Sequence, residues 1–273
     1  MRKKGDAQSD AEAGDEIDPR YVVPGLSRGL AMLQLFTREE PSQTLMDLAN
    51  GLGVTRSAAY RLVYTLEKDG FIVRDPATRA YKLTARVLSL GFEYLNSLGL
   101  SDVATPILRR ITERISAAAH LVVLDGWQVV YLARVAPSVA LVSNLQVGTR
   151  LPVHLTASGR VLLAEEDEAG LMDIYRQIRR GDRMNASPSS FEALRSQAQE
   201  DRTRGYVYRA SPLDRGLVTF ACAVRDGTGK AIAAINVIGP EHVMGSFGGE
   251  DALKPLVLEA ALSISREIGY RGP

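Results

Sequence analysis

The sequence predicts an α+β protein with an N-terminal winged helix-turn-helix, a linker helix and a C-terminal domain built on a mostly antiparallel sheet. Residues 44–83 contain, in order, a short helix, a glycine-containing turn, a second helix and two β-like stretches, which is the order of a winged helix-turn-helix. Residues 84–98 have apolar side chains at helical spacing. Residues 101–273 alternate strands with helices. Together these patterns indicate two domains joined by a helix.

Length and composition narrow the class of protein. The chain has 273 residues, which exceeds one average domain and suits two. No stretch approaches the ~18 consecutive apolar residues of a membrane span, and no apolar run follows the basic start as in a secretory signal. Residues 1–19 hold three basic and six acidic side chains, so we expect a disordered tail there. The single cysteine, Cys222, excludes an intramolecular disulfide, and the whole pattern fits a soluble cytoplasmic protein.

The winged helix domain is expected over residues 20–83, beginning with a helix over 27–38. In that helix Leu30, Leu33 and Phe36 recur at the spacing of a buried face, so we expect them to point inward.

The helix-turn-helix follows. Gly51 and Gly53 allow the turn between its helices, where a positive φ is expected. Thr55 is a good N-cap for the second helix, because its hydroxyl can accept from the free amides of the first turn. The apolar stripe of that helix, at i, i+3, i+4 and i+7, consists of Ala59, Leu62, Val63 and Leu66.

The opposite face of the second helix carries groups that donate to phosphates and base edges. They are Arg56, Ser57, Tyr60, Arg61, Tyr64 and Lys68. Such a face is often merely solvated. Here, however, residues 55–86 hold seven basic and three acidic side chains, a local charge of +4 in a chain of net +1, and phosphate contacts need that local concentration. The turn at 75–79 places Arg74, Arg79 and Lys82 on a wing.

The residues expected to contact DNA belong to the start of the second helix and to the wing. They are Thr55, Arg56, Ser57, Ala58, Tyr60, Arg61, Arg74 and Arg79.

Residues 84–100 are expected to form a linker and dimerisation helix. Its stripe is broad enough to pack on more than one partner, although the helix could also pack back on its own domain. The stripe consists of Val87, Leu90, Gly91, Tyr94 and Leu98. From residue 96 to 101 the helix is expected to loosen into a linker.

The C-terminal domain, residues 101–273, is expected to resemble a GAF or PAS sensor domain, because a mostly antiparallel sheet is covered by helices. Strands are predicted at 120–124 and 129–133, which form a hairpin, and at 139–147, 206–208, 217–224 and 231–237. Helices are predicted from 102, and at 158–164, 168–179, 190–203 and 253–268.

No catalytic or metal-binding motif stands out. The three histidines are scattered without carboxylate partners nearby in sequence, and Gly227–Lys230 has the wrong spacing and context for a phosphate loop. We therefore expect no cofactor, no metal and no enzyme active site. One segment does favour a small-molecule site: small residues at 156–159 leave backbone amides at a helix start, where a carboxylate can bind. An ordinary capped helix would give the same local pattern.

Several of these segments together resemble the IclR family of bacterial transcriptional regulators. The resemblance covers about residues 22–268 and, within the family, is greatest to the branch that controls protocatechuate and β-ketoadipate catabolism. The segments that carry it are residues 25–30, 55–62, 123–126, 148–164 and 232–237.

The resemblance implies a homodimer, often paired into a homotetramer, that binds a palindromic double-stranded DNA operator and a small organic acid effector. The family's effector positions correspond to Ala157, Ser158, Arg209, Leu217, Thr219, Asn236 and Ile238. This chain has Arg209 where many members have an acidic residue, and Thr219 where many have cysteine. The charge of the pocket is thus changed, which favours a ligand with a carboxylate, aromatic or dicarboxylic.

Three functions remain open at this point. The first is a ligand-responsive transcription factor without enzymatic activity. The second is an enzyme acting on a small organic acid, with a regulatory N-terminal domain. The third is a constitutive DNA-bound scaffold with an empty pocket. Turnover of a bound acid would identify the enzyme, and a ligand-dependent operator affinity would identify the sensor.

Overall fold

The computed structural model describes residues 18–37, 39–90, 99–137, 145–181 and 187–272. The chain forms two compact units, Met1–Tyr94 and Leu95–Pro273, which are described separately below. Most of the predicted N-terminal tail lies outside the described residues. Among the described helices, none is long and apolar enough to cross a membrane.

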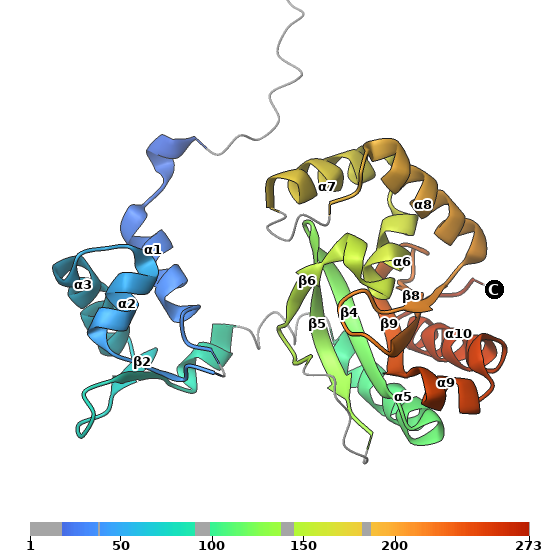
Figure 1. Cartoon of the computed structure of the whole chain (residues 1–273), viewed down its shortest axis with the longest axis horizontal. Coiled ribbons are helices and arrows are strands. Elements are labelled where there is room, and N and C mark those ends of the chain that lie inside the picture. The colour runs from blue at the N-terminus through green and yellow to red at the C-terminus, as the bar shows by residue number, and fades with distance from the viewer. Residues whose placement is uncertain (1–17, 38, 91–98, 138–144, 182–186, 273) are drawn as a thin grey trace, which may run out of the picture. The chain divides into compact units, whose positions relative to one another are not determined.

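The first unit is a helix-turn-helix with a small sheet (Figure 1). Its core is formed by Met32, Leu48, Val63 and Ile72, with other apolar side chains packed around them. The strands are antiparallel in the order β1-β3-β2. The elements of this unit are η1 (Pro19–Tyr21), α1 (Pro24–Leu33), β1 (Ser42–Gln43), α2 (Leu45–Leu52), α3 (Arg56–Lys68), β2 (Ile72–Arg74) and β3 (Tyr81–Leu83).

The predicted turn between α2 and α3 is present, but only one of its glycines needs a positive φ. Gly53 ends α2 in the left-handed conformation, at φ 62°. Gly51 instead lies inside α2, where an added Cβ would lie 2.9 Å from a methyl group of Leu35. Gly51 therefore allows close packing, whereas Gly53 makes the turn.

The opening helix begins and ends earlier than predicted, because Pro24 occupies its first turn and the chain turns after Leu33. Leu33 and Phe36 pack partly against the core as expected. The prediction for Leu30 was wrong: half of its surface is exposed, because only the last turn of α1, with Met32 fully buried, packs on the core.

The predicted linker helix is described only at its start. Residues 86–90 are helical, and 91–98 lie outside the described residues. The predicted loosening at 96–101 is wrong at its end, because Leu100 begins a long helix that buries Leu100 and Ala104.

The second unit is a six-stranded sheet with strand order β6-β5-β4-β9-β8-β7, and every neighbouring pair is antiparallel. The α+β prediction is confirmed. Its elements are α5 (Leu100–Ile115), β4 (Ala118–Asp125), β5 (Gln128–Val135), β6 (Arg150–Pro152), η2 (Val153–Leu155), α6 (Ala157–Glu165), α7 (Glu168–Gly181), α8 (Phe191–Arg204), β7 (Val207–Ala210), β8 (Leu217–Arg225), β9 (Ala231–Pro240), α9 (Glu241–Ser246) and α10 (Gly249–Glu267).

Helices cover both faces of this sheet (Figure 1). Helices α5 and α10 pack on one face, against Leu121, Phe220 and Ile235. Helices α6, α7 and α8 lie on the other face, where Val122 and Ala221 contribute to a second core cluster. Side chains alternate along each strand, so His120 and Asn236 face the α6 side.

Two predictions for this unit were wrong. The strand expected at 139–147 is absent from 145–147, and 138–144 lie outside the described residues; the edge strand is β6, which follows the turn at Gly148. The short helix α9 was not predicted, because six residues containing one buried side chain, Met244, give no clear periodicity. Cys222 is buried as expected, and burial raises the pKa of its thiol.

Candidate functional site: a recognition helix and a buried cavity

The start of α3 is fixed by a cap and presents its polar face to solvent. The Thr55 hydroxyl accepts a hydrogen bond from the Ala58 amide at 3.3 Å. Arg56, Ser57 and Tyr60 are exposed, whereas Ala59 and Val63 on the opposite face are fully buried. Burying the apolar stripe therefore orients the basic side chains outward.

A hollow of about 710 Å³ brings the helix start and the wing together. Three arginines line it, Arg56, Arg74 and Arg79, and none of the described acidic side chains does. Ser57 and Tyr60 complete the α3 side of this wing groove. Uncompensated arginines on a concave surface attract phosphate. Arg61 is exposed but lies outside the wing groove, on the side of α3 that faces α1.

The wing turn is held by Asp75, whose carboxylate accepts from the Thr78 and Ala77 amides at 3.0 and 2.9 Å. These hydrogen bonds hold the pKa of Asp75 below its usual value. Arg79 then takes a left-handed φ of 60°, and the Arg74 Nε donates to its carbonyl at 3.3 Å. Arg74 is partly engaged in the wing, whereas the Arg79 guanidinium is available to a ligand.

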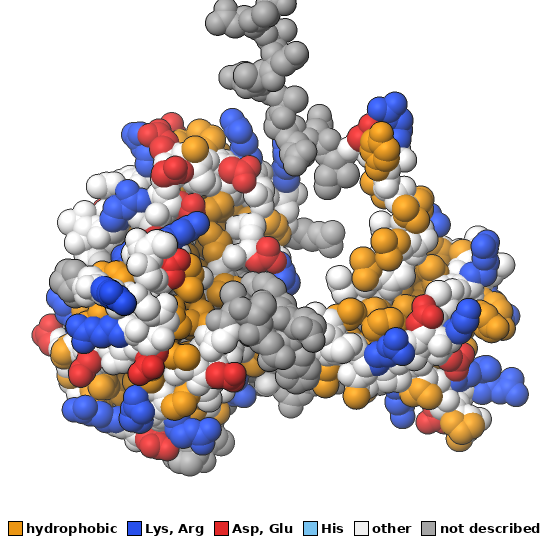
Figure 2. Space-filling view, turned by 180° about the vertical axis from the view of Figure 1, so that it is seen from behind, with side chains coloured by type: hydrophobic (Ala, Val, Ile, Leu, Met, Phe, Trp, Pro, Cys, Tyr) orange, Lys and Arg blue, Asp and Glu red, His pale blue; other side chains and the backbone are white. Residues whose placement is uncertain are grey.

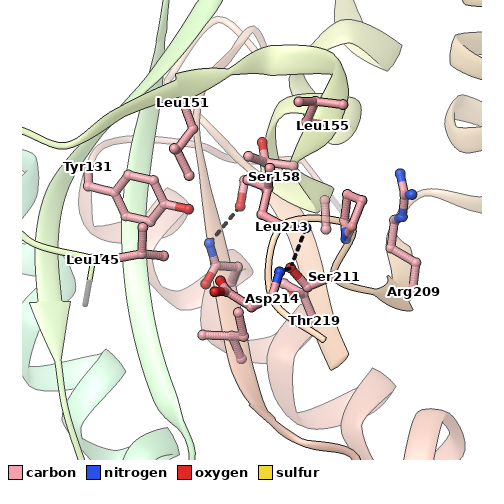
Figure 3. A pocket seen from close by; sticks show the side chains of 15 residues that line it. Tyr131, Leu145, Leu151, Leu155, Ser158, Arg209, Ser211, Leu213, Asp214 and Thr219 are labelled. Carbon is pink, nitrogen blue, oxygen red and sulfur yellow. Dashed lines mark hydrogen bonds between the residues drawn. The ribbon is translucent and has the colours of Figure 1, made fainter. Parts of the chain in front are cut away.

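The second unit contains a small polar cavity between the sheet and the start of α6 (Figure 3). Its volume is about 30 Å³, room for roughly two water molecules. Six of the seven predicted effector residues line it: Ala157, Ser158, Arg209, Thr219, Asn236 and Ile238. The seventh, Leu217, does not line it; Leu217 is buried against Ala118 and Ile238.

A chain of buried hydrogen bonds forms one wall of the cavity. The Asn236 Nδ2 donates to the Ser158 hydroxyl at 2.7 Å, and the Asn236 Oδ1 lies 2.9 Å from the His120 Nδ1. His120 is fully buried and meets the Tyr131 ring edge-on. Burial lowers the pKa of His120 to about 4 and raises that of Tyr131 to about 12, so both are neutral at neutral pH.

Residues 156–159 were interpreted either as a small-molecule site or as an ordinary capped helix. The start of α6 has both features, because it is capped and also lies at the cavity. The Thr156 hydroxyl accepts from the Gly159 amide at 2.9 Å, so that amide is occupied. A Cβ on Gly159 would lie 2.0 Å from the Val153 carbonyl oxygen, so only glycine allows this approach. Ala157 and Ser158 carry the remaining amides of the first turn, and both residues line the cavity.

Arg209 stands at the border between this cavity and a neighbouring one of about 310 Å³. In Figure 3 its guanidinium points away from Ser158. Burial lowers the pKa of Arg209, and the nearby Arg160 lowers it further. Arg160 is already paired with Asp201, at 2.6 and 2.8 Å. Among the described residues none forms a hydrogen bond or ion pair with the Arg209 guanidinium, so a ligand carboxylate would find it free.

Sequence reasoning missed four polar residues of this site: His120, Tyr131, Ser211 and Asp214. The Asp214 carboxylate lies at the cavity, while its amide donates to the Ser211 hydroxyl at 3.1 Å (Figure 3). The polar His120 within an otherwise apolar strand was the available signal, since a buried polar side chain needs a partner.

Comparisons with known proteins agree with this architecture. Residues 25–76 match the IclR helix-turn-helix domain, and residues 92–266 match the bacterial transcriptional regulator IclR C-terminal domain. The chain is 34% identical over 252 residues to the Pca regulon regulatory protein of Pseudomonas putida, which covers 92% of this chain and 86% of the relative. It is 27% identical to the regulator XynR of Escherichia coli, covering 91% and 98%.

Among solved structures, an IclR homolog from Microbacterium hydrocarbonoxydans in complex with 4-hydroxybenzoate shares the fold, with a TM-score of 0.76 at 24% identity, covering 89% of this chain and 98% of that one. The two domain matches account for most of the chain, and the relatives are named regulators. The chain therefore belongs to the IclR family and is a DNA-binding transcriptional regulator, not an enzyme.

Proposed function

We propose that the protein binds a palindromic operator as a homodimer. Its affinity for the operator changes when a hydroxylated aromatic acid occupies the cavity of the second unit. Such a regulator works in the cytoplasm, with the DNA. The observation that supports DNA binding is the wing groove, which three arginines line and which none of the described acidic side chains lines. The α3 start enters the major groove, and Arg79 contacts phosphate from the wing.

An exposed apolar face on the first unit supports the dimer. Leu26, Leu30 and Leu90 are each more than half exposed, and they line one groove of about 640 Å³ together with Leu33 and Phe71. Figure 2 shows hydrophobic side chains along this unit. A second copy of the same face would cover it and place two α3 helices in symmetric relation, as a palindrome requires. Pairing of such dimers into a homotetramer belongs to the same proposal.

Leu30→Glu tests this interface, because Leu30 is exposed and its replacement leaves the core intact. A charge desolvated in the interface should shift sedimentation toward a smaller species and weaken binding to the palindrome more than to a half-site. Val73→Glu, equally exposed but outside the groove, should leave the sedimentation coefficient unchanged. If both variants sediment as the wild type does, this face is not the dimer interface.

The polar groups of the cavity favour a ligand with an acceptor at one end and a donor at the other. The Ser158 hydroxyl and the α6 amides suit a carboxylate, and Arg209 adds positive charge at the border. Asp214 suits a hydroxyl group, because an ionised carboxylate only accepts hydrogen bonds. The similarity to the Pca regulon regulatory protein and to the IclR homolog in complex with 4-hydroxybenzoate supports this class of ligand.

The small size of the cavity means that a bound ligand must change the conformation of the residues around it. At about 30 Å³ it is well below the roughly 150 Å³ that holds benzene. A ring must therefore move the lining, and the segment 211–214 is a surface connection without regular structure. A ligand that binds only the opened arrangement shifts the population toward it.

Calorimetry is the test of the ligand. We expect 4-hydroxybenzoate to bind at least about tenfold more tightly than its methyl ester or amide, since a hydrogen bond to a charged group exceeds a neutral one by about that factor.

Selection of DNA duplexes from random sequence is the test of the operator, and the selected sequences should be palindromes. Equal affinity for acid and ester would overturn the assignment of a carboxylate ligand, and selected half-sites without symmetry would overturn the operator geometry.

A further inference from the structure

We propose that His120 is a positioning residue that fixes the orientation of the Asn236 amide and thereby keeps the Ser158 hydroxyl free to donate to the effector. His120 does not line the cavity; it lies behind Asn236, opposite it on the paired strands β4 and β9. The inference deepens the proposed function and rests on it for its ligand, but not for its first test.

The orientation of the Asn236 side chain is set by its neighbours. An asparagine amide has one end that donates and one that accepts, and either end could face Ser158. With Nδ2 toward Ser158, as here, the Ser158 oxygen accepts at 2.7 Å and its own proton remains for another acceptor. With the ends exchanged, Ser158 would have to donate to Asn236. The cavity would then lose a hydroxyl donor.

His120 favours the first orientation because of what surrounds its other nitrogen. The Nε2 is buried and has no hydrogen-bond partner among the described residues. A buried N–H without a partner is rarer and more costly than an unpaired acceptor. The proton therefore belongs on Nδ1, where it donates to the Asn236 Oδ1 at 2.9 Å.

Tyr131 reinforces the same arrangement. The Asn236 side chain interacts with the Tyr131 hydroxyl and opposes the rise in the pKa of Tyr131 that burial causes. Nδ2 thus donates to the Ser158 hydroxyl, and Oδ1 accepts from the ring N–H of His120. The result is a directional chain from His120 through Asn236 to Ser158 and on to the ligand.

The charge state of His120 is fixed as well. It is fully buried, and Arg134 lies opposite it on β5 and disfavours a second positive charge. The ring therefore remains a single donor at neutral pH. The direction of the hydrogen bonds from His120 through Asn236 to Ser158 thus does not vary with small changes of pH.

The first test needs no effector. Nitrogen-15 NMR of the full chain with labelled histidine should show a neutral His120 with the proton on Nδ1 from pH 5.5 to 8. A proton on Nε2 in the wild type would overturn the proposal, whether or not the protein binds an aromatic acid. Failure of the acids to bind would instead overturn the proposed function and leave this result standing.

The second test measures ligand preference. His120→Leu removes the donor and frees the amide to turn, so the affinity ratio of 4-hydroxybenzoate to its amide should fall by about tenfold, the effect of losing a hydrogen bond to a charged group. His120→Gln keeps an N–H donor and should restore the ratio. A merely structural role would lower both affinities together and leave the ratio unchanged, which would contradict the proposal.

Asn236→Asp provides an independent check if His120→Leu does not fold. The introduced carboxylate, when ionised, can accept from both His120 and Ser158 but donate to neither, so it captures the Ser158 proton. The same loss of preference for the acid is expected. A wild-type ratio in this variant would mean that the Ser158 proton is not the ligand's donor.

Discussion

The two units of this protein build their functional surfaces in opposite ways. In the first unit the functional side chains are exposed, lie close in sequence from Thr44 to Tyr81, and are oriented by a stripe buried on the far side of one helix. In the second most of them are buried, and they come from residues as far apart as Tyr131 and Ile238. A substitution on the exposed surface of the first unit should therefore have little effect on stability. A substitution in the polar cavity of the second unit should also change stability, because its side chains hydrogen-bond to one another in the interior.

The largest expected difference between the units is their response to acid. All three histidines belong to the second unit, and His120 has a folded pKa near 4 against about 6.5 when unfolded. Between these values the unfolded chain binds more protons, so stability falls as pH drops from about 6.5 toward 4, by up to about 3 kcal/mol.

Urea unfolding of the second unit, followed by the fluorescence of its Trp127, should show this loss between pH 7 and 4.5. His120→Gln should abolish most of the slope. A wild-type slope that is unchanged in that variant would mean that another group carries the pH dependence.

A second expected difference concerns DNA binding. Arg56 is exposed at the start of α3 and lines the wing groove, so Arg56→Ala should weaken operator binding by about 1–3 kcal/mol without lowering stability. Arg114→Ala, an equally exposed arginine in the other unit, is the matched control. Anisotropy titration at fixed salt measures both. Because Arg56 lines the wing groove, an unchanged affinity would contradict the placement of DNA in that groove.

The two helix caps form a matched pair. Thr55 caps α3 at the surface, and Thr156 caps α6 in the interior. Thr55→Ala should lower the free energy of unfolding by about 1 kcal/mol. Thr156→Ala should cost more, about 1–3 kcal/mol, because the Gly159 amide would be left buried and unpaired. Denaturant midpoints of the two units would show whether burial makes this difference; equal costs would contradict it.

The smallest expected effect is at Arg79, whose left-handed φ favours glycine or asparagine. Arg79→Asn should keep the stability of the first unit or raise it by a few tenths of a kcal/mol, since asparagine tolerates this conformation. The same change should lower the slope of log affinity against log salt by about one. An unchanged slope would show that Arg79 does not contact phosphate, and a loss of stability would show that its side chain has a structural role.

The comparison also explains what the sequence could predict. Periodicity and capping identified α3 with its cap and stripe, because these depend on neighbours within one helix turn. The hairpin β4–β5 followed from two apolar runs around a glycine turn. The family resemblance supplied six of the cavity residues.

The remainder depended on tertiary contacts. Residues 120 and 236 meet only because β4 and β9 pair, although they are 116 positions apart. Leu217 shares a face of β8 with Thr219 but lies two residues before it, where it packs on Ala118 and Ile238 and does not line the cavity. Leu30 was misplaced because only the last turn of α1, at Met32 and Leu33, packs on the core.

The central claim is that the second unit reads an acid and the first reads DNA, so that the two can be altered separately. Operator affinity should be measured with and without saturating 4-hydroxybenzoate in the wild type, Arg56→Ala and Ser158→Ala. The acid should change the wild-type affinity by at least about fivefold, the lower range of allosteric coupling. Arg56→Ala should bind the operator more weakly but keep that ratio, and Ser158→Ala should bind the operator normally but lose it. A wild-type ratio of one, with the acid shown to be bound, would contradict the account.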